Sequence, residues 1–247
     1  MFFRKKKAAA TPIEQLRTER KYLLTHEQDF YLEEAYKSLR TNVMFSLAGR
    51  SGSKVVMVTA AAQGEGKSMT SANLALAFAQ AGKKTLLIDC DLRRPKQARL
   101  FELRSGAGLS NVLLQPELLD SALLNTEQEN FKVLLSGDVP PNPSELLGSE
   151  GMQKLMEQLR ERFDYIILDT PPVNLVTDAM VLAGCIDGVL FVVRSGLAEM
   201  NSVKQAVSQM EYAGAKLLGF VLNDVKESSG HGGYDRHYGG YGYRADK

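Results

Sequence analysis

The sequence has little of what marks secreted, metal-clustered or membrane-spanning proteins. Its two cysteines, Cys90 and Cys185, lie far apart within apolar runs and lack metal-ligand spacing. We therefore interpret both as buried thiols of a reducing compartment. No apolar run approaches the ~20 residues that a membrane-spanning helix needs. A net charge of only +1 gives no argument for nucleic-acid binding, and none is expected.

The N-terminus is basic but is not followed by an apolar segment of signal-peptide length. Residues 1–7 could touch an anionic membrane surface at about 1 kcal/mol per charge, and a solvated start explains them equally well. We expect a cytoplasmic protein. A chain of 247 residues, 44% apolar and 24% charged, is compatible with one large α/β domain.

A phosphate-binding pattern occupies residues 61–68, which read Ala-Ala-Gln-Gly-Glu-Gly-Lys-Ser after an apolar run at 55–58. A strand, a glycine-rich loop and a helix start in this order are typical of a P-loop, whose backbone N–H groups face phosphate oxygens. In such a loop Lys67 serves the β- and γ-phosphates and Ser68 serves Mg²⁺. Ala61 replaces the usual first glycine, so the motif needs support from the rest of the chain.

Apolar runs alternate with helical patterns along the chain, and this alternation predicts a doubly wound, mostly parallel α/β sheet. Strands are expected at 54–60, 85–91, 133–135, 163–169, 187–193 and 216–222. Helices are expected at 30–47, 67–80, 144–147, 152–162 and about 199–212, with short helices in 109–125.

Carboxylates end two of the expected strands. Asp169 closes an apolar run, which is the arrangement of a Walker B aspartate that holds Mg²⁺, usually through water. Asp89 and Asp91 end another run, and on an extended segment they are expected to point the same way. Ligands of such sheets bind at the carboxyl ends of the strands, so all three should lie near the P-loop.

The composition divides the chain into an extended lead-in (1–29), one α/β domain (30–225) and a tail (226–247). Residues 228–243 are rich in glycine and tyrosine and contain no aliphatic residue, so we expect the tail to be disordered. Tyrosines that stay in water, with no apolar surface to cover them, are suitable substrates for a tyrosine kinase. The tail carries Tyr234, Tyr238, Tyr241 and Tyr243.

These patterns together resemble the bacterial protein-tyrosine kinases that control capsular and exopolysaccharide synthesis, in the form in which the kinase is a separate cytoplasmic chain. The resemblance runs from about Glu33 to the end of the chain. The matching stretches are 34–42, the loop 63–68, a second Walker motif at 87–95, Pro-Pro-Asn-Pro-Ser-Glu-Leu-Leu at 140–147, 166–172 and the tyrosine tail. It implies a P-loop NTPase fold with a deviant, positioning-ATPase-like Walker A motif.

The resemblance also implies ATP and Mg²⁺ as cofactors and assigns the site residues. The nucleotide-binding set is Gly64, Glu65, Gly66, Lys67, Ser68 and Met69. Arg194 and Asn223 are added because they end two late strands of the expected sheet, where a base could be recognised. The metal set is Ser68, Asp89 and Asp169, and the catalytic set is Lys67, Asp89, Asp91 and Asp169. A tyrosine hydroxyl must lose its proton to attack phosphorus, and either Asp91, which we favour, or Asp89 can accept it.

Partners are implied as well. The family assembles a ring through Glu-x-x-Arg-x-x-Arg, which here reads Glu34, Lys37 and Arg40; from the residues alone, the three charges could equally form a solvated helix face. Lysine cannot make the bidentate fork of arginine, which weakens the expected ring. In the dephosphorylated ring, one subunit's tail serves as substrate for its neighbour, alongside other protein tyrosine substrates. A transmembrane adaptor activates the kinase through a cytoplasmic tail and holds it at the membrane periphery.

Two other functions compete with the kinase hypothesis. Positioning and partitioning ATPases share the fold and act as nucleotide switches, but they carry a second lysine early in the P-loop, where this chain has Ala62. A non-catalytic nucleotide-binding adaptor would usually lose a metal carboxylate. Here Lys67 and all three aspartates are present.

Overall fold

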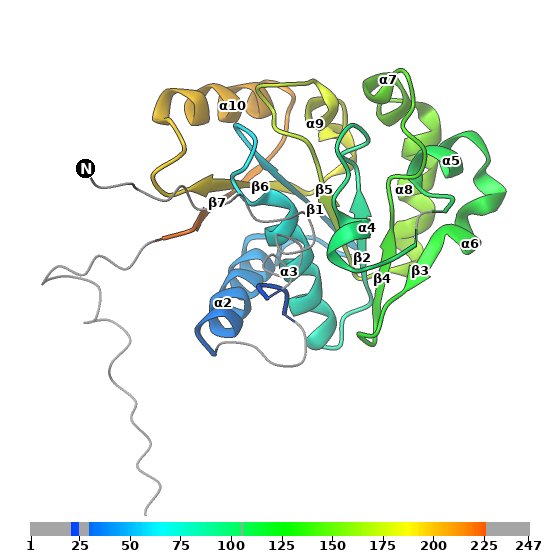
Figure 1. Cartoon of the computed structure of the whole chain (residues 1–247), viewed down its shortest axis with the longest axis horizontal. Coiled ribbons are helices and arrows are strands. Elements are labelled where there is room, and N and C mark those ends of the chain that lie inside the picture. The colour runs from blue at the N-terminus through cyan, green and yellow to red at the C-terminus, as the bar shows by residue number, and fades with distance from the viewer. Residues whose placement is uncertain (1–20, 25–29, 105, 226–247) are drawn as a thin grey trace, which may run out of the picture.

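A seven-stranded sheet forms the middle layer of the chain, with helices on both faces (Figure 1). The computed structural model describes residues 21–24, 30–104 and 106–225. In chain order the strands are β1 (Lys54–Ala60), β2 (Thr85–Asp89), β3 (Leu123–Asn125), β4 (Phe131–Leu134), β5 (Tyr165–Asp169), β6 (Gly188–Arg194) and β7 (Leu217–Asn223). Their order across the sheet is β3-β4-β2-β5-β1-β6-β7.

All neighbouring strands are parallel except the β3–β4 pair, which confirms the predicted doubly wound, mostly parallel sheet. Strand β3 was not predicted, because residues 109–125 were expected to be helical throughout. It has three residues and pairs antiparallel with β4, so Leu123 lies opposite Leu134 at the sheet edge. A three-residue leucine-rich strand has no period that separates it from a helix end.

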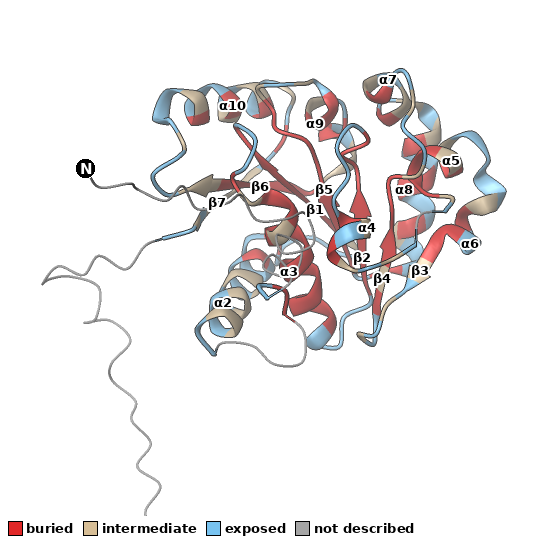
Figure 2. Ribbon diagram, in the orientation of Figure 1, coloured by how far each residue is buried: buried red, intermediate tan, exposed pale blue. Residues whose placement is uncertain are grey.

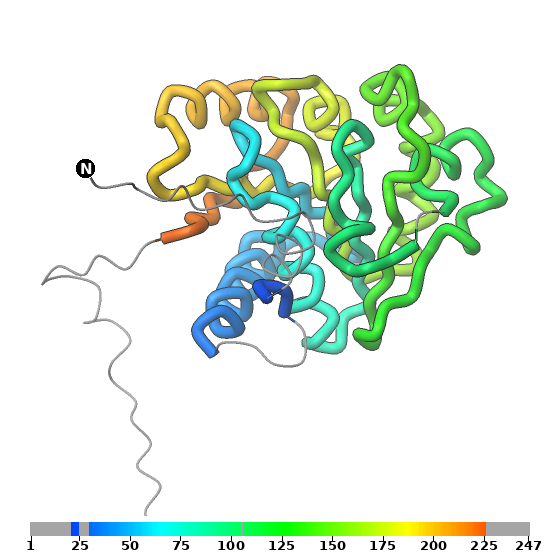
Figure 3. Tube along the Cα trace, viewed as in Figure 1, coloured from blue at the N-terminus to red at the C-terminus, as the bar shows by residue number. Residues whose placement is uncertain are grey.

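One face of the sheet is covered by α2 (Phe30–Ser46), α3 (Lys67–Gln80) and the short α4 (Gln97–Leu100). Helix α3 is buried along most of its length because α2 lies over it (Figure 3). Leu23 and Leu24 add to this layer, and both are 2% exposed. The Asn73 side chain of α3 holds them by accepting the Leu24 N–H at 2.8 Å and donating to the Tyr22 carbonyl at 2.6 Å.

The other face is covered by helices from the second half of the chain. They are α5 (Leu109–Leu114), η1 (Pro116–Leu118), α6 (Leu119–Ala122), α7 (Pro143–Leu147), α8 (Glu150–Arg162), α9 (Asp178–Val181), η2 (Ala183–Cys185) and α10 (Met200–Tyr212). Ser149 caps the N-terminus of α8, where its hydroxyl accepts the Met152 N–H. None of the helices described is long and apolar enough to cross a membrane.

Burial is greatest at the centre of the sheet, where the P-loop begins (Figure 2). Every residue of β2 and β5 is buried, and in β1 only Lys54 is not. These are the near-continuous apolar runs expected of strands that are covered on both faces. Edge strand β7 differs, since Phe220 and Leu222 stay more than half exposed.

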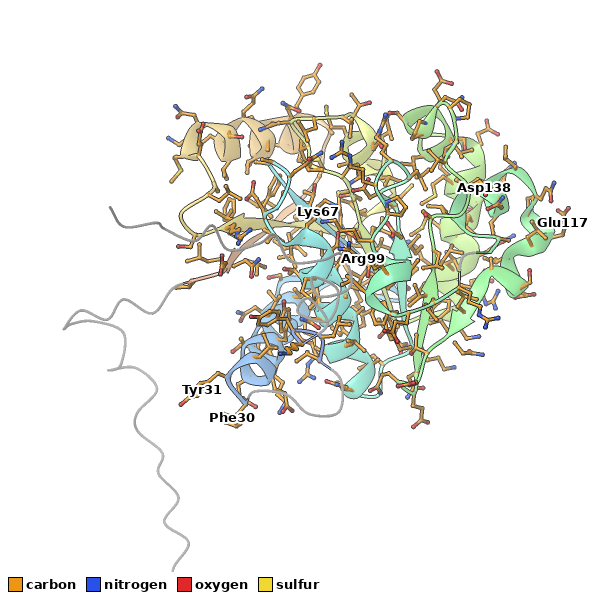
Figure 4. The ribbon with its side chains drawn as sticks, viewed as in Figure 1. Phe30, Tyr31, Lys67, Arg99, Glu117 and Asp138 are labelled. Carbon is orange, nitrogen blue, oxygen red and sulfur yellow. The ribbon has the colours of Figure 1, made fainter. Side chains whose placement is uncertain are left out.

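The three charged residues Glu34, Lys37 and Arg40 of α2 do not share one set of contacts in the structure. Lys37 pairs with Glu33 at 2.7 Å and with Glu34 at 2.9 Å. Arg40 instead turns toward α3 and donates to the Ala77 carbonyl at 2.9 Å. Within one chain, therefore, Arg40 joins two helices, while the other two charges stay at the surface. Phe30 and Tyr31 project from the outer end of the same helix (Figure 4).

Candidate active site

The P-loop connects β1 to α3 at the carboxyl edge of the sheet, and glycine is required at two of its positions. Gly64 has φ 82° and Gly66 has φ 97°, a left-handed conformation that side chains with a Cβ rarely adopt. A Cβ on Gly66 would also collide with the side-chain amide of Asn223. Helix α3 starts directly afterwards at Lys67, so its free N–H groups face the loop.

Two residues from the ends of β6 and β7 hold this loop. Asn223 donates to the Glu65 carbonyl at 2.9 Å, and the Arg194 guanidinium donates to the Gly64 carbonyl at 3.1 Å. The buried Glu65 carboxylate accepts the Ala62 N–H at 2.8 Å. The structure therefore brings Arg194 and Asn223 to the P-loop, where their donors bind the loop itself.

Lys67 lies at the centre of the site (Figure 4). Its ammonium is 2.9 Å from Asp91 Oδ2 and 3.6 Å from Asp169 Oδ1, and the residue is 8% exposed. Burial acts to lower the pKa of Lys67, but the carboxylates of Asp169 and Asp91 outweigh it and raise the pKa above its ordinary value. The lysine is thus held as a cation among carboxylates.

Asp89 and Asp169 end adjacent strands in direct register. Parallel neighbours lie about 4.8 Å apart, so two buried carboxyl groups face the same space. Burial, and next the charge of Asp169, raise the pKa of Asp89 to about 7. The pair is therefore poised to take up positive charge, either a proton or a cation.

Asp89 and Asp91 make different contacts, although the charges of both act on Lys67. Strand β2 ends at Asp89, whose carboxylate accepts the N–H groups of Asp91, Lys96 and Gln97 at 3.2, 3.1 and 3.0 Å. These bonds turn the chain, so Asp91 leaves the strand direction and pairs with Lys67 instead. The alternation of side chains applies only within a strand, so the position of Asp91 depends on these bonds and not on strand geometry.

Gln97 is a site residue that the sequence did not reveal. Its buried side-chain amide donates to Asp169 Oδ2 at 2.7 Å and to the Ser68 carbonyl at 3.0 Å. It thus joins the strand-end carboxylate to the first turn of α3. Gln97 belongs to a four-residue helix with no motif of its own. The only signal in the sequence is that it follows Asp89 by eight residues.

The residues present fit a magnesium ion. Asp169 Oδ1 is buried without a hydrogen-bond partner, and the carboxylates and the Ser68 hydroxyl offer only oxygen ligands. Among the described residues, no group of three or more His, Cys, Asp or Glu side chains forms a metal site.

The remaining predicted residues lie in three places. Met69 is half-buried against the layer of α2 and α3. Glu34 and Lys37 lie on α2, on the surface of the helix layer. The four tail tyrosines fall outside the described residues.

The fold and this loop define a P-loop nucleotide-binding protein, and comparison supports that class. A family model described as "AAA domain" matches residues 53–216. The match spans β1 to the last residue before β7, so it covers the P-loop and all three carboxylates.

Comparison with individual relatives shows which family of P-loop proteins the chain resembles. Tyrosine-protein kinase YwqD of Bacillus subtilis (strain 168) is 40% identical over 226 residues, 92% of this chain and 93% of that protein. Tyrosine-protein kinase CpsD of Streptococcus agalactiae is 42% identical over 216 residues, 87% and 92% of the two chains. The crystal structure of the chimerical protein CapA2B2 matches with TM-score 0.79 and 41% identity, covering 83% of this chain and 91% of that one. The chain belongs to the family of bacterial tyrosine-protein kinases.

Proposed function

We propose that this chain transfers the γ-phosphoryl group of ATP to tyrosine hydroxyls of proteins, and that it does so in the control of capsular or exopolysaccharide synthesis. The observation that carries the proposal is the buried Lys67 ammonium at the start of α3, held between Asp91 and Asp169. Relatives named as tyrosine-protein kinases support the choice of acceptor.

The P-loop would hold the triphosphate. Backbone N–H groups from Gly64 to Met69 are the donors, and Lys67 leaves its carboxylates for the β- and γ-phosphates. Arg194 and Asn223 border the same loop. The Asn223 side-chain oxygen stays available as an acceptor while its amide nitrogen holds Glu65, so it is suited to a base amino group.

Ser68, Asp89 and Asp169 would hold Mg²⁺, which when bound neutralises charge that develops on the phosphoryl group. Gln97 fixes the orientation of Asp169 through its 2.7 Å bond. The three backbone bonds to Asp89 fix the second carboxylate. The oxygens are thus in place before ligand arrives, which is the preorganisation that electrostatic catalysis requires.

Asp91 is the proposed proton acceptor. Its Oδ2 is occupied by Lys67 in this structure, and its Oδ1 accepts the Arg94 N–H at 3.0 Å. Once Lys67 turns to phosphate, Oδ2 becomes free to take the proton of an incoming tyrosine hydroxyl. Asp89 is the alternative acceptor, but it already accepts three backbone N–H groups and its remaining capacity would serve Mg²⁺.

The acceptors and partners are also proposals. Tyr234, Tyr238, Tyr241 and Tyr243 would be phosphorylated in trans, within a ring whose subunits meet through Glu34, Lys37 and Arg40. A tail of about 20 residues spans up to ~3.3 Å per residue, enough to reach a neighbour. A transmembrane adaptor would complete the nucleotide site with its cytoplasmic tail and hold the cytoplasmic chain at the membrane.

The deciding experiment is incubation with labelled ATP and Mg²⁺, followed by detection of phosphotyrosine. We expect label on the tail, and Lys67→Met should lower it by at least about 100-fold. Lys83→Met, which removes an exposed lysine after α3, is the matched control and should label normally. Steady ATP hydrolysis without phosphotyrosine, also in the presence of the adaptor tail, would support the positioning-ATPase alternative instead.

A second comparison separates the acceptor sites from the chemistry. Replacing the four tail tyrosines by phenylalanine should remove most self-labelling while an added tyrosine peptide is still phosphorylated. The wild-type chain should be stimulated by the adaptor's cytoplasmic tail. Equal activity with and without that tail would contradict the proposed activation.

A further inference from the structure

Arg93 lies two residues after Asp91, within the second Walker motif, and makes an ion pair that is not yet assigned a role. Its guanidinium donates Nε to Asp178 Oδ2 at 2.9 Å and Nη2 to Asp178 Oδ1 at 3.0 Å. This is the two-pronged geometry that only arginine provides. The Asp178 side chain is 0% exposed, while that of Arg93 is 39% exposed.

Ser144 and Thr177 extend this pair into a small network. The Ser144 hydroxyl donates to Asp178 Oδ1 at 2.6 Å and receives Arg93 Nη2 at 3.2 Å. Thr177 donates to Ser144 Oγ at 3.2 Å. The buried carboxylate thus has partners on both oxygens, as a buried charge needs.

The network joins three loops at the carboxyl edge of the sheet. Arg93 belongs to the loop between β2 and α4, and Ser144 lies in the first turn of α7, after the proline-rich loop. Asp178 begins α9, nine residues after Asp169. These loops form the side of the site away from Arg194 and Asn223, which hold the P-loop from the β6 and β7 side.

The loop that carries Asp91 is held by backbone bonds on its inner side, which faces the site, and by a side-chain ion pair on its outer side, which faces α9. On the inner side Asp91 Oδ1 accepts the Arg94 N–H, and Asp89 accepts the Lys96 N–H. On the outer side, among the contacts of the described residues, Arg93 ties the loop to Asp178. Leu92 is buried in the core and Arg94 donates to Gln63 Oε1 at 3.2 Å, so loss of the Arg93 bond would loosen the loop without releasing it, and we expect the Asp91 carboxylate to shift.

We propose that Asp178, acting through Arg93, is a positioning residue that sets the rate of phosphoryl transfer to tyrosine without contributing to nucleotide binding. The inference rests on the proposed kinase function. Among the contacts of the described residues, the network bonds directly to neither Lys67 nor the P-loop. It reaches Lys67 only through Asp91, a bond that Lys67 gives up when it turns to phosphate, so ATP affinity should depend little on it. The position of Asp91 does depend on it, and a displacement of about 1 Å can cost up to ~100-fold in rate.

The test measures phosphotyrosine formation on an added peptide at saturating ATP and, separately, the Kd for ATP. Asp178→Asn and Arg93→Ala should each lower kcat by at least about 10-fold and change the Kd for ATP by less than about twofold. The double variant should be no slower than the slower single variant, because the two residues act as a unit. Arg93→Lys should recover little, since lysine lacks the second prong.

Arg160→Lys is the matched control. Arg160 also pairs with a buried aspartate, Asp187, at 2.8 Å, but near the opposite edge of the sheet, where β1 and β6 begin. This variant should lose stability and keep its kcat. Parallel loss of ATP affinity in Asp178→Asn would overturn the proposal, as would an unchanged kcat or an equal slowing in Arg160→Lys at a temperature where all variants are folded. A wild-type chain that hydrolyses ATP but forms no phosphotyrosine would instead refute the kinase function itself.

Discussion

At the scale of single residues, the site depends on how four charged groups share one buried space. Lys67 is a cation next to Asp91 and Asp169, and Asp89 faces Asp169 from the adjacent strand. Three carboxylates and one ammonium leave an excess of negative charge. That excess suits a site that binds a cation and a phosphate chain. Burial, and next the charge of Asp169, raise the carboxyl pKa of Asp89 to about 7.

Gln97 supplies the neutral donor that this cluster needs, and its replacement is the first prediction. Gln97→Glu should be more damaging than Gln97→Met, because it removes the donor to Asp169 and adds a further carboxylate beside it. We expect Gln97→Met to lower the free energy of unfolding by about 1–3 kcal/mol and Gln97→Glu by more. Denaturant unfolding of the metal-free protein at pH 8 measures both.

The control for this prediction is Gln153→Met on the exposed side of α8. A glutamine at the surface makes no comparable bond, so its free energy of unfolding should change by less than about 0.5 kcal/mol. If Gln97→Glu proved as stable as Gln97→Met, the like-charge argument for the site would be wrong.

At the scale of elements, the segment at residues 21–24 is the least expected part of the core. The lead-in was expected to be extended, yet Leu23 and Leu24 are buried against the layer of α2 and α3. Gln80 and Asn73 of α3 hold the backbone of this segment through the Leu24 carbonyl and N–H. Two leucines in a polar stretch show no helical or strand period, so the sequence could not reveal the contact.

The second prediction follows from that contact. Leu23→Ala should lower the free energy of unfolding by about 2–4 kcal/mol, because it removes a side chain that is 2% exposed and leaves a cavity. Tyr22→Ala is the neighbouring control, since Tyr22 is 56% exposed and should cost less than about 1 kcal/mol. Equal losses in the two variants would mean that the segment does not pack on α3 in solution.

How far the sequence predicts the elements depends on their length and period. The long helices α2, α3, α8 and α10 and the buried strands β1 and β5 have clear patterns, and each was predicted within a few residues. Strand β3 was missed because it has only three residues. The end of β2 was placed too late because side-chain bonds to Asp89 decide it, not hydrophobic period.

The residues of the site also differ in how far the sequence predicts them. The strand–loop–helix motif and the strand-end aspartates were predicted, because a parallel sheet brings those ends together whatever surrounds them. The partners of these residues were not. Gln97 and the direction of Arg40 depend on packing between segments distant in sequence, and no local pattern encodes such contacts.

At the scale of the whole molecule, the two edges of the sheet differ in chemistry. The carboxyl edge gathers the P-loop and the aspartates around one lysine. Near the opposite edge, Asp187 accepts the Val55 N–H at 2.7 Å and pairs with Arg160 and Arg50. It thereby joins β1, α8 and the loop after α2, so a single carboxylate connects both helix layers to the sheet.

The last prediction concerns how this carboxylate makes stability depend on pH. Burial acts to raise the pKa of Asp187, but the bonds from Arg160 and Val55 outweigh it and lower the pKa below its ordinary value. A carboxyl group whose pKa is lower in the folded state stabilises the fold above its unfolded pKa of about 3.9. That contribution disappears as pH falls through the folded value, because the proton then binds both states.

Asp187→Asn should therefore lower the free energy of unfolding by about 3 kcal/mol at pH 7, since it leaves Arg160 without its charged partner. The difference from wild type should stay constant between about pH 5 and pH 8 and shrink as the pH falls below about 4. Denaturant unfolding across that range measures it. A difference that instead grew toward acid would show that the folded pKa of Asp187 is raised, and the arginines would then not be its dominant partners.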